Sequence, residues 1–340
     1  MNRILLLVFV LCSGILISFQ DMVFTISSTI SIPDNWPKPI FNFADNPLTE
    51  EGFQLGRELF YDPSLSGDKT ISCASCHLQF TGFTHVDHNV SHGIGGRKGT
   101  RNAPALINLA WNSSFHWDGG VNHLEVQPTN PIQHSAEMDN TLENVLFYLK
   151  ASTKYRQLFF AAFGDSLIDS KRMLKAFAQF NVSLISSNSK YDQYIRKEIA
   201  FTSQENNGLK IFRKHCASCH TEPLFNSNKF ASNGLKMDTA FNDVGRYAIT
   251  HLYEDSLQFR IPTLRNIEHT FPYMHDGRYR KLKEVIDLYT ESIDIDGNYL
   301  SPELRRKISL NSDEKKDLIA FLYTLTDKEF LYNPRFGFPR

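Results

Sequence analysis

Two short stretches of this 340-residue chain repeat the pattern Cys-x-x-Cys-His, within ISCASCH at 71–77 and HCASCH at 215–220. This spacing is typical of covalent c-type haem attachment. The two thiols bond to the vinyl groups on one edge of the porphyrin, and the imidazole that follows binds the iron. We therefore predict two haems. Their ligands are Cys73, Cys76 and His77 for one, and Cys216, Cys219 and His220 for the other.

Similar spacing also occurs in zinc knuckles, thioredoxin-like redox pairs and disulfides. A zinc site drawing on both pairs would use four thiolates, or three thiolates and one imidazole. Such a site leaves the histidine after each pair unexplained. The fifth cysteine, Cys12, lies in the N-terminal leader, so every other cysteine belongs to a motif. The motifs favour haem, and the alternatives stay open at this point.

The leader predicts export. Arg3 precedes an apolar run from Ile4 to Ile17, which has the length of a signal peptide's apolar region and is short for a membrane span. No clear small-residue cleavage site follows. We expect residues 1–20 to be a signal peptide or an N-terminal anchor, with cleavage favoured, and the protein to be periplasmic. Export suits c-type haem, which is attached outside the bacterial cytoplasm.

The composition is that of a soluble globular protein: 41% hydrophobic, 21% charged and 13% aromatic residues. A net charge of −1 gives no sign of a nucleic-acid partner. Residues 21–46 are largely polar and punctuated by proline, which predicts a linker or surface arm. The polar stretch 187–190 is the expected boundary between an N-terminal domain at 47–187 and a C-terminal domain at 188–340.

Apolar residues recur at helical spacing in several segments, and no segment alternates long enough for a sheet. Thr49 is a candidate N-cap, and Asn311 or Ser312 another. The fold class we expect is mainly α, with two fused cytochrome-c-like domains, each packed around one covalent haem, and long loops. Helices are expected at 50–60, 141–150, 170–186, 204–215, 282–289 and from 311 onward.

Four longer stretches resemble the bacterial di-haem cytochrome c peroxidase family, which includes MauG-type enzymes. They are LGRELFYDPSLSGDKTISCASCH at 55–77, GTRNAPALINLAWNSSFHWDGG at 99–120, NPIQHSAEM at 130–138 and RIPTLRNIEHTFPYMHDGR at 260–278. They occur in the family's order, and the resemblance covers nearly all of the exported chain.

The resemblance implies unequal roles for the two haems. The haem on His77 matches the peroxide-reacting centre, and the haem on His220 matches the centre that accepts electrons. Trp117 matches a tryptophan between the haems, although a buried core tryptophan is the simpler interpretation. Glu137 matches the distal acid–base glutamate, which moves a proton between the peroxide oxygens, and Gln127 matches a nearby glutamine. From pattern alone, Glu137 is a charge preceding a helix.

Two iron ligands depart from the pattern of the classical peroxidases. His92 lies near the place of their gating histidine, although displaced by two residues, and is either that ligand or a polar loop residue. The sixth ligand of the second haem falls on Tyr289, the MauG-type choice, with Met274 as the alternative. A phenolate ligand would stabilise the oxidised iron, whereas a thioether would raise the reduction potential.

The resemblance also implies a Ca²⁺ ion between the haems, with oxygen ligands from Asn102, Thr270 and Pro272. Arg265 and His275 match positions beside the second haem. They could pair with haem propionates or serve structural pairing alone.

Three functions remain in competition. The first is reduction of hydrogen peroxide to water, with electrons from a small cytochrome c or cupredoxin and a possible homodimer. The second is MauG-like oxidation of a protein or small-molecule substrate, which Tyr289 favours. The third is a non-catalytic di-haem electron carrier, against which Glu137 and Gln127 argue.

Overall fold

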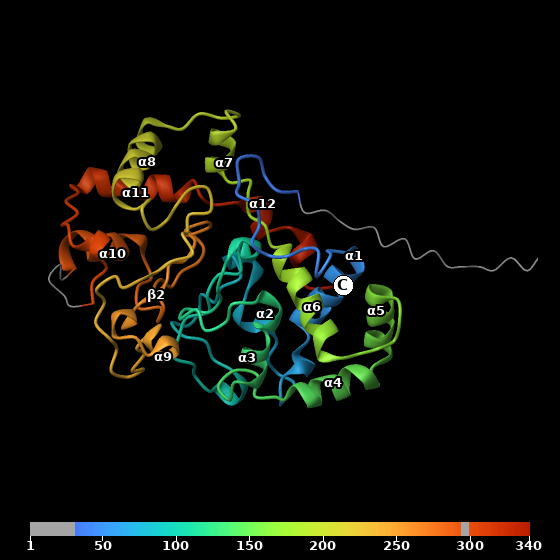
Figure 1. Cartoon of the computed structure of the whole chain (residues 1–340). Helices are drawn as coiled ribbons and strands as arrows, with labels where there is room; N and C mark the ends of the chain where they lie inside the picture. The colour runs from blue at the N-terminus through green and yellow to red at the C-terminus, as the bar shows by residue number, and fades with distance from the viewer. Residues whose placement is uncertain (1–30, 294–298) are drawn as a thin grey trace, which may run out of the picture.

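The computed structural model describes residues 31–293 and 299–340 (Figure 1). The predicted leader at 1–20 and the first part of the arm lie outside the described residues. The expected mainly helical class is confirmed. The α-helices are α1 (Glu50–Tyr61), α2 (Cys73–Cys76), α3 (Thr129–Gln133), α4 (Leu142–Ala151), α5 (Thr153–Phe163), α6 (Ser170–Val182), α7 (Lys190–Ile195), α8 (Ser203–His215), α9 (Tyr247–Thr250), α10 (Leu282–Asp287), α11 (Ser312–Tyr323) and α12 (Lys328–Leu331).

Strand structure is slight. Two strands of two residues each, β1 (Phe230–Ala231) and β2 (Phe259–Arg260), pair antiparallel. Within the described part of the chain, no helix has both the length and the apolar character needed to span a membrane.

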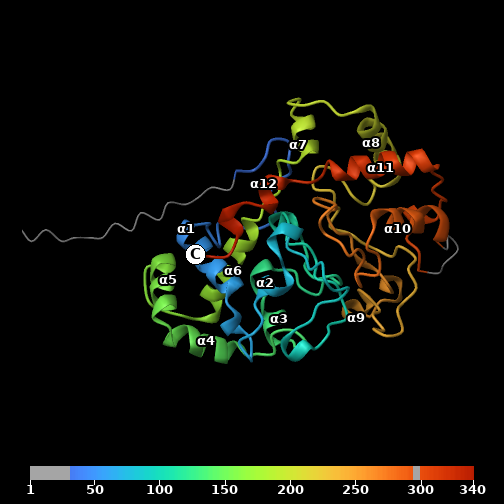
Figure 2. The same ribbon diagram turned by 180° about the vertical axis from the view of Figure 1, so that it is seen from behind.

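The two halves of the chain build separate helical groups, visible from both sides (Figures 1 and 2). In the first, α1 packs against α5 and α6. In the second, α8 packs against α11. Both contacts need glycine for close approach: a Cβ on Gly56 would lie 2.0 Å from the Ala176 carbonyl oxygen, and one on Gly208 2.0 Å from that of Asp317. Each group thereby holds the helix that leads into its Cys-x-x-Cys-His motif.

The end of the chain returns to the first group. Phe330, Leu331 and Phe336 are buried in the same apolar core as α1 and α6. The Arg57 guanidinium donates to the Gly337 carbonyl at 2.7 Å. Figure 1 shows the C-terminus beside α1. The domain limits 47–187 and 188–340 stay a prediction, and the last residues of the second segment pack on the first.

Two helices begin at the predicted caps, and two others end at residues that differ clearly from those predicted. The Thr49 hydroxyl accepts from the Gly52 N–H, and the Asn311 side chain forms a capping box with Glu314, as expected. The helix expected at 170–186 stops at Val182. It ends there because the Ser183 N–H bonds to carbonyls of the preceding turn, which closes the helix. The helix expected at 282–289 ends at Asp287 and continues as a π-helix over Leu288–Ser292.

Candidate functional site

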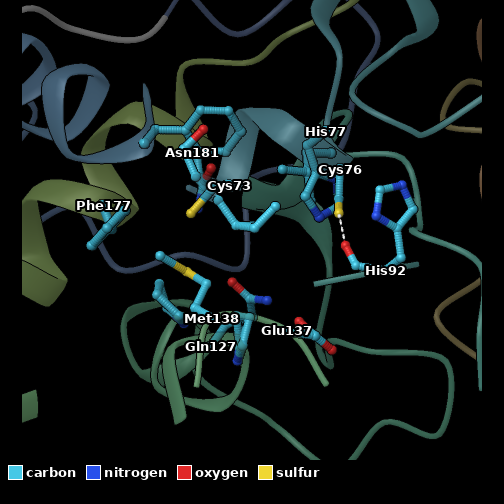
Figure 3. A pocket seen from close by; sticks show the side chains of 15 residues that line it. Cys73, Cys76, His77, His92, Gln127, Glu137, Met138, Phe177 and Asn181 are labelled. Carbon is cyan, nitrogen blue, oxygen red and sulfur yellow. Dashed lines mark hydrogen bonds between the residues drawn. The ribbon is translucent and has the colours of Figure 1, made fainter. Parts of the chain in front are cut away.

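The first motif forms a one-turn helix, α2, whose side chains line a cavity of about 560 Å³. The His77 N–H closes the turn by donating to the Cys73 carbonyl at 3.0 Å. Cys73, Cys76 and His77 all face this cavity (Figure 3). The apolar part of the cavity wall is formed by Phe60, Ile71, Leu106 and Phe177. The predicted ligands of the first haem are therefore assembled at one apolar cavity.

The His77 imidazole is held in one orientation and one tautomer. Its Nδ1 lies 2.7 Å from the Phe83 carbonyl oxygen, which can only accept, so Nδ1 carries the proton. Nε2 is then left with its lone pair free for a metal. Burial lowers the pKa of His77 to about 4, so the ring is neutral near pH 7, the form that ligates iron.

Gln127 and Glu137 line the same cavity and lie across it from Cys73 and His77 (Figure 3). The Glu137 side chain is 37% exposed. Burial raises the pKa of its carboxyl, and the charge of the nearby His134 imidazole acts in the opposite direction. A carboxyl with a raised pKa can take up and release a proton closer to neutral pH than an ordinary glutamate.

Main-chain contacts fix the position of Glu137. Its N–H donates to the His134 carbonyl at 2.9 Å, just after α3, and its carbonyl accepts from the Ile94 N–H at 2.9 Å. The neighbouring Gly93 has no side chain to hold the two segments apart, since a Cβ there would lie 2.3 Å from the Glu137 Cα. The segment that carries His92 thus packs directly against Glu137, and His92 also lines the cavity.

One residue of this cavity escaped the sequence reasoning. Asn181 is buried in α6, and its Oδ1 has no hydrogen-bond partner among the described residues. It lies one turn after Phe177, so both belong to the same helix face. A polar residue within the apolar stripe of α6 is the signal that could have marked it.

The second motif repeats the arrangement at a larger cavity, of about 1710 Å³. The His220 N–H donates to the Cys216 carbonyl at 2.9 Å. Its Nδ1 lies within 3.2 Å of the carbonyl oxygens of Phe225 and Pro262, which again leaves Nε2 free for a metal. Burial lowers the pKa of His220. The cavity contains the predicted residues Cys216, Cys219, His220, Trp117, Asn102, Thr270, Pro272, Met274, His275 and Tyr289.

Both candidates for the sixth ligand of the second haem are present in this cavity. Asn233 connects them: its Nδ2 donates to the Met274 sulfur at 3.3 Å, and its side chain also hydrogen-bonds Tyr289. Burial raises the pKa of Tyr289 to about 12, so the phenol keeps its proton at neutral pH unless a cation lies beside it. Asn233 lies in a loop and had no sequence signal.

Trp117 and Asn102 are joined at the wall of the second cavity. The Trp117 indole N–H donates to the Asn102 carbonyl at 2.8 Å, and Trp117 is 8% exposed. The Asn102 amide donates to the Asn89 carbonyl at 3.0 Å, which leaves its Oδ1 available. The three residues predicted to bind calcium, Asn102, Thr270 and Pro272, line this one cavity.

Arg265 forms a buried ion pair within the protein. It is fully buried, and its two Nη atoms each lie 2.8 Å from an oxygen of Asp192. This pairing favours the structural alternative, because the carboxylate of Asp192 already binds the guanidinium. His275 does line the second cavity, with its ring stacked on Phe259 at 3.7 Å.

Arg260 is a second buried arginine. It has no carboxylate partner within the described ranges, and burial lowers its pKa to about 10. Its N–H donates to the Trp117 carbonyl at 2.7 Å, which places its main chain beside the second cavity. A carboxylate of a bound group would provide the missing counter-charge.

These observations fit covalent haem at both places. Each cavity has apolar walls, two free cysteines and an imidazole whose Nε2 is free. The first adds an amide oxygen without a hydrogen-bond partner among the described residues, and beside the second lies Arg260, whose side chain donates to the His116 carbonyl and has no carboxylate partner within the same ranges. Cysteines with a nearby histidine also suit zinc, but a zinc site does not require an apolar cavity around its ligands.

The chain is similar to proteins of one family. The sequence profile described as di-haem cytochrome c peroxidase matches residues 50–200. The chain is 33% identical to the methylamine utilization protein MauG of Methylorubrum extorquens, over 91% of this chain and 86% of that protein. It is 32% identical to the cytochrome c551 peroxidase of Nitrosomonas europaea, over 83% and 82%.

The chain also resembles solved structures of related proteins. A MauG-like protein associated with microbial copper homeostasis superposes with a TM-score of 0.85 at 33% identity, over 92% of this chain and 99% of that one. The diheme peroxidase BthA of Burkholderia thailandensis, at 21% identity and a TM-score of 0.72, covers 87% and 91% and shares the fold.

Proposed function

The chain belongs to the di-haem cytochrome c peroxidase family, and from this premise we propose that it reduces hydrogen peroxide to water in the periplasm. The electrons would come from a small cytochrome c or cupredoxin, and each turnover converts H₂O₂, two electrons and two protons into two waters. One observation carries the proposal: Glu137 and Gln127 face Cys73 and His77 across one cavity (Figure 3). A pure electron carrier needs no proton-handling group there.

The haem on His77 would supply the iron at which the O–O bond is cleaved, and the haem on His220 would take up electrons from the donor. Glu137 in its ionised form can accept the proton of the bound peroxide oxygen and deliver it to the oxygen that leaves as water. The Gln127 amide can hydrogen-bond the bound oxygen. His77 is oriented by one main-chain carbonyl and His220 by two, and both would hold their Nε2 atoms ready to ligate.

The role of His92 as a gating ligand stays a proposal, as does the homodimer. We also propose one Ca²⁺ at Asn102, Thr270 and Pro272. A carboxamide oxygen and carbonyl oxygens are the donors that this ion prefers. The support is that the three residues share one cavity wall and that the Asn102 amide already has its own acceptor.

A second candidate function is MauG-like oxidation of another substrate with peroxide-derived oxidising equivalents. Tyr289 favours it, since the residue lines the second cavity and would be a charge-donating ligand. The similarity to methylamine utilization protein MauG points the same way. Under either enzymatic function Glu137 would act as the acid–base group.

The test is Glu137→Gln, with Glu143→Gln as the matched control. Glu143 is an exposed residue in the first turn of α4. We expect peroxide turnover by Glu137→Gln to fall about 10²- to 10⁴-fold, the usual worth of a general acid–base group. Haem content and the rate of chemical reduction should match wild type, and the control should be fully active.

The pH profile adds a second measurement. The pKa of Glu137 is raised, so wild-type turnover should decline as acidification protonates the carboxylate, beginning above the ordinary glutamate range. Glu137→Gln should lack this acid limb. If Glu137→Gln turned over peroxide like wild type, the acid–base role of Glu137 would be refuted. If wild type had no peroxide activity, the electron-carrier function would replace the proposal.

A further inference from the structure

Three histidines outside both haem motifs gather in one loop, and one of them, His92, lines the first cavity. His85, His88 and His92 each offer a ring nitrogen, and these atoms all lie within 4.8 Å of one another. The ring centroids of His88 and His92 are 4.3 Å apart, and those of His85 and His88 are 5.0 Å apart with the rings stacked. Neutral imidazoles at such distances provide converging lone pairs.

One ring nitrogen of the buried histidine in the cluster has no hydrogen-bond partner among the described residues. His85 is 5% exposed, and its Nδ1 has no hydrogen-bond partner in the part of the chain that the structure describes. A buried polar nitrogen without a partner costs free energy. His88 is exposed and His92 half-buried, so the cluster has a buried base and an open side.

We propose that His85, His88 and His92 bind one divalent transition-metal ion, with Zn²⁺ as the reference case. Nitrogen ligands suit zinc, copper and nickel, whereas calcium and magnesium take oxygen. Three imidazoles leave the fourth position of a tetrahedral site to water. With Zn–N bonds of about 2.0–2.1 Å the ligand nitrogens would lie roughly 3.4 Å apart, so small rotations of the side chains complete the site.

The loop that carries the cluster is held by Asn102 and by two residues of the second half of the chain. The Asn89 carbonyl accepts from the Asn102 amide at 3.0 Å, and Gly277 lies so close that a Cβ would come within 2.1 Å of the same oxygen. The Arg280 guanidinium donates to the Val86 carbonyl at 2.8 Å. A loop fixed in this way presents its histidines already gathered, which lowers the entropic cost of binding an ion.

Two charged side chains act near the cluster. Arg280 brings a positive charge to the Val86 carbonyl, which opposes a cation. Asp87 acts on His85 with the opposite sign. The binding itself would come from the three imidazoles.

A bound ion would also hold the His92 ring in the cluster. The His92 carbonyl accepts from the Cys76 thiol at 3.5 Å, so its main chain borders the first haem site (Figure 3). Its imidazole cannot bind both the ion and the haem iron. Metal binding itself is independent of the peroxidase function, and turnover is not its readout.

The experiment uses the full holoprotein with both haems, treated with a chelator and then equilibrated with Zn²⁺. Metal content by elemental analysis and affinity by calorimetry are compared for wild type, His88→Ala and His123→Ala. His88 and His123 are both exposed, so neither substitution disturbs the core. We expect one zinc per two irons in wild type and in His123→Ala.

His88→Ala should bind Zn²⁺ at least about 100-fold more weakly, because losing a direct ligand exceeds the 10- to 100-fold cost of losing an outer-shell partner. Excess Ca²⁺ should leave the zinc in place, which separates this site from the proposed calcium site. If wild type bound no zinc, if Ca²⁺ displaced it, or if His88→Ala bound it like His123→Ala, the three-histidine site would be refuted.

Discussion

The buried ion pair between Arg265 and Asp192 gives the sharpest test of how the second half is stabilised. Arg265 is 0% and Asp192 6% exposed at the side chain, and two parallel hydrogen bonds of 2.8 Å join them. Arg265 also donates to the Pro223 carbonyl, three residues after His220. Asp192→Asn keeps the shape of the acid but leaves the guanidinium charge buried without a counter-charge.

Removing one partner of a buried pair costs about 3–5 kcal/mol, because the remaining charge stays desolvated. We expect that loss in the free energy of unfolding of Asp192→Asn. Arg265→Met should cost a comparable amount, with a further contribution from the Trp36 ring, whose centroid lies 4.6 Å from the guanidinium carbon. In the double variant no charge is stranded, so its loss should be clearly smaller than the sum of the two single losses.

The measurement is urea unfolding of the holoprotein at neutral pH, followed by far-UV circular dichroism and by haem absorbance. Glu198→Gln, which removes one partner of an exposed pair with Arg196, is the control and should change stability little. If Asp192→Asn cost less than about 1 kcal/mol, or if the single losses simply added in the double variant, the pair would not act as a coupled buried ion pair.

The pair also predicts how stability depends on pH. Burial raises the pKa of Asp192, but the hydrogen bonds and charge of Arg265, together with Ser189, outweigh it and hold the pKa below its ordinary value. A carboxyl whose pKa is lowered in the folded state contributes stability above its unfolded pKa and loses it as pH falls toward the folded one. We expect this contribution to decline below about pH 4, and Asp192→Asn to lack that part of the slope.

Two further predictions concern the second cavity and its scaffold. If the phenol of Tyr289 ligates the second haem, Tyr289→Phe should change the resonance Raman spectrum of that haem and raise its reduction potential, while Met274→Leu should do neither. The reverse result would identify the Met274 sulfur as the ligand. No change in either variant would contradict both assignments. Gly208→Ala should lower the midpoint of thermal unfolding despite the better helix propensity of alanine, because its Cβ would lie 2.0 Å from the Asp317 carbonyl oxygen; an unchanged midpoint would show that α8 and α11 can separate at little cost.

Local signals predicted where one helix of each helical group begins. Thr49 and Asn311 cap the helices that begin after them because a side-chain oxygen followed by a helical pattern is sufficient to specify a start. Helix ends were less well determined. The end of α6 at Val182 and the π-helix at Leu288–Ser292 depend on local closure and packing, which the periodicity of apolar residues does not encode.

The shared cavities were predicted as far as the family motifs extended. Those motifs placed Glu137 opposite His77 and Tyr289 near His220. Contacts between distant segments had no such signal. Arg265 and Asp192 are 73 positions apart, and nothing in either neighbourhood distinguishes a buried pair from two surface charges. Asn233 touches both candidate ligands from a loop whose path only the tertiary fold sets.

The junction between the two halves accounts for the fixed place of Trp117. Arg101 forms ion pairs with Asp118, the neighbour of Trp117, and with Asp243 of the second half. The next residue, Asn102, accepts the indole N–H of Trp117 and donates its own N–H to the His275 carbonyl at 2.7 Å. Two consecutive residues therefore bind both sides of the junction. Because Trp117 is bonded through its indole, and Arg101 and Asn102 bind both halves, the junction is tied together at the wall of the second cavity. Under the proposed function, such a junction would help to keep the separation of the two haems constant.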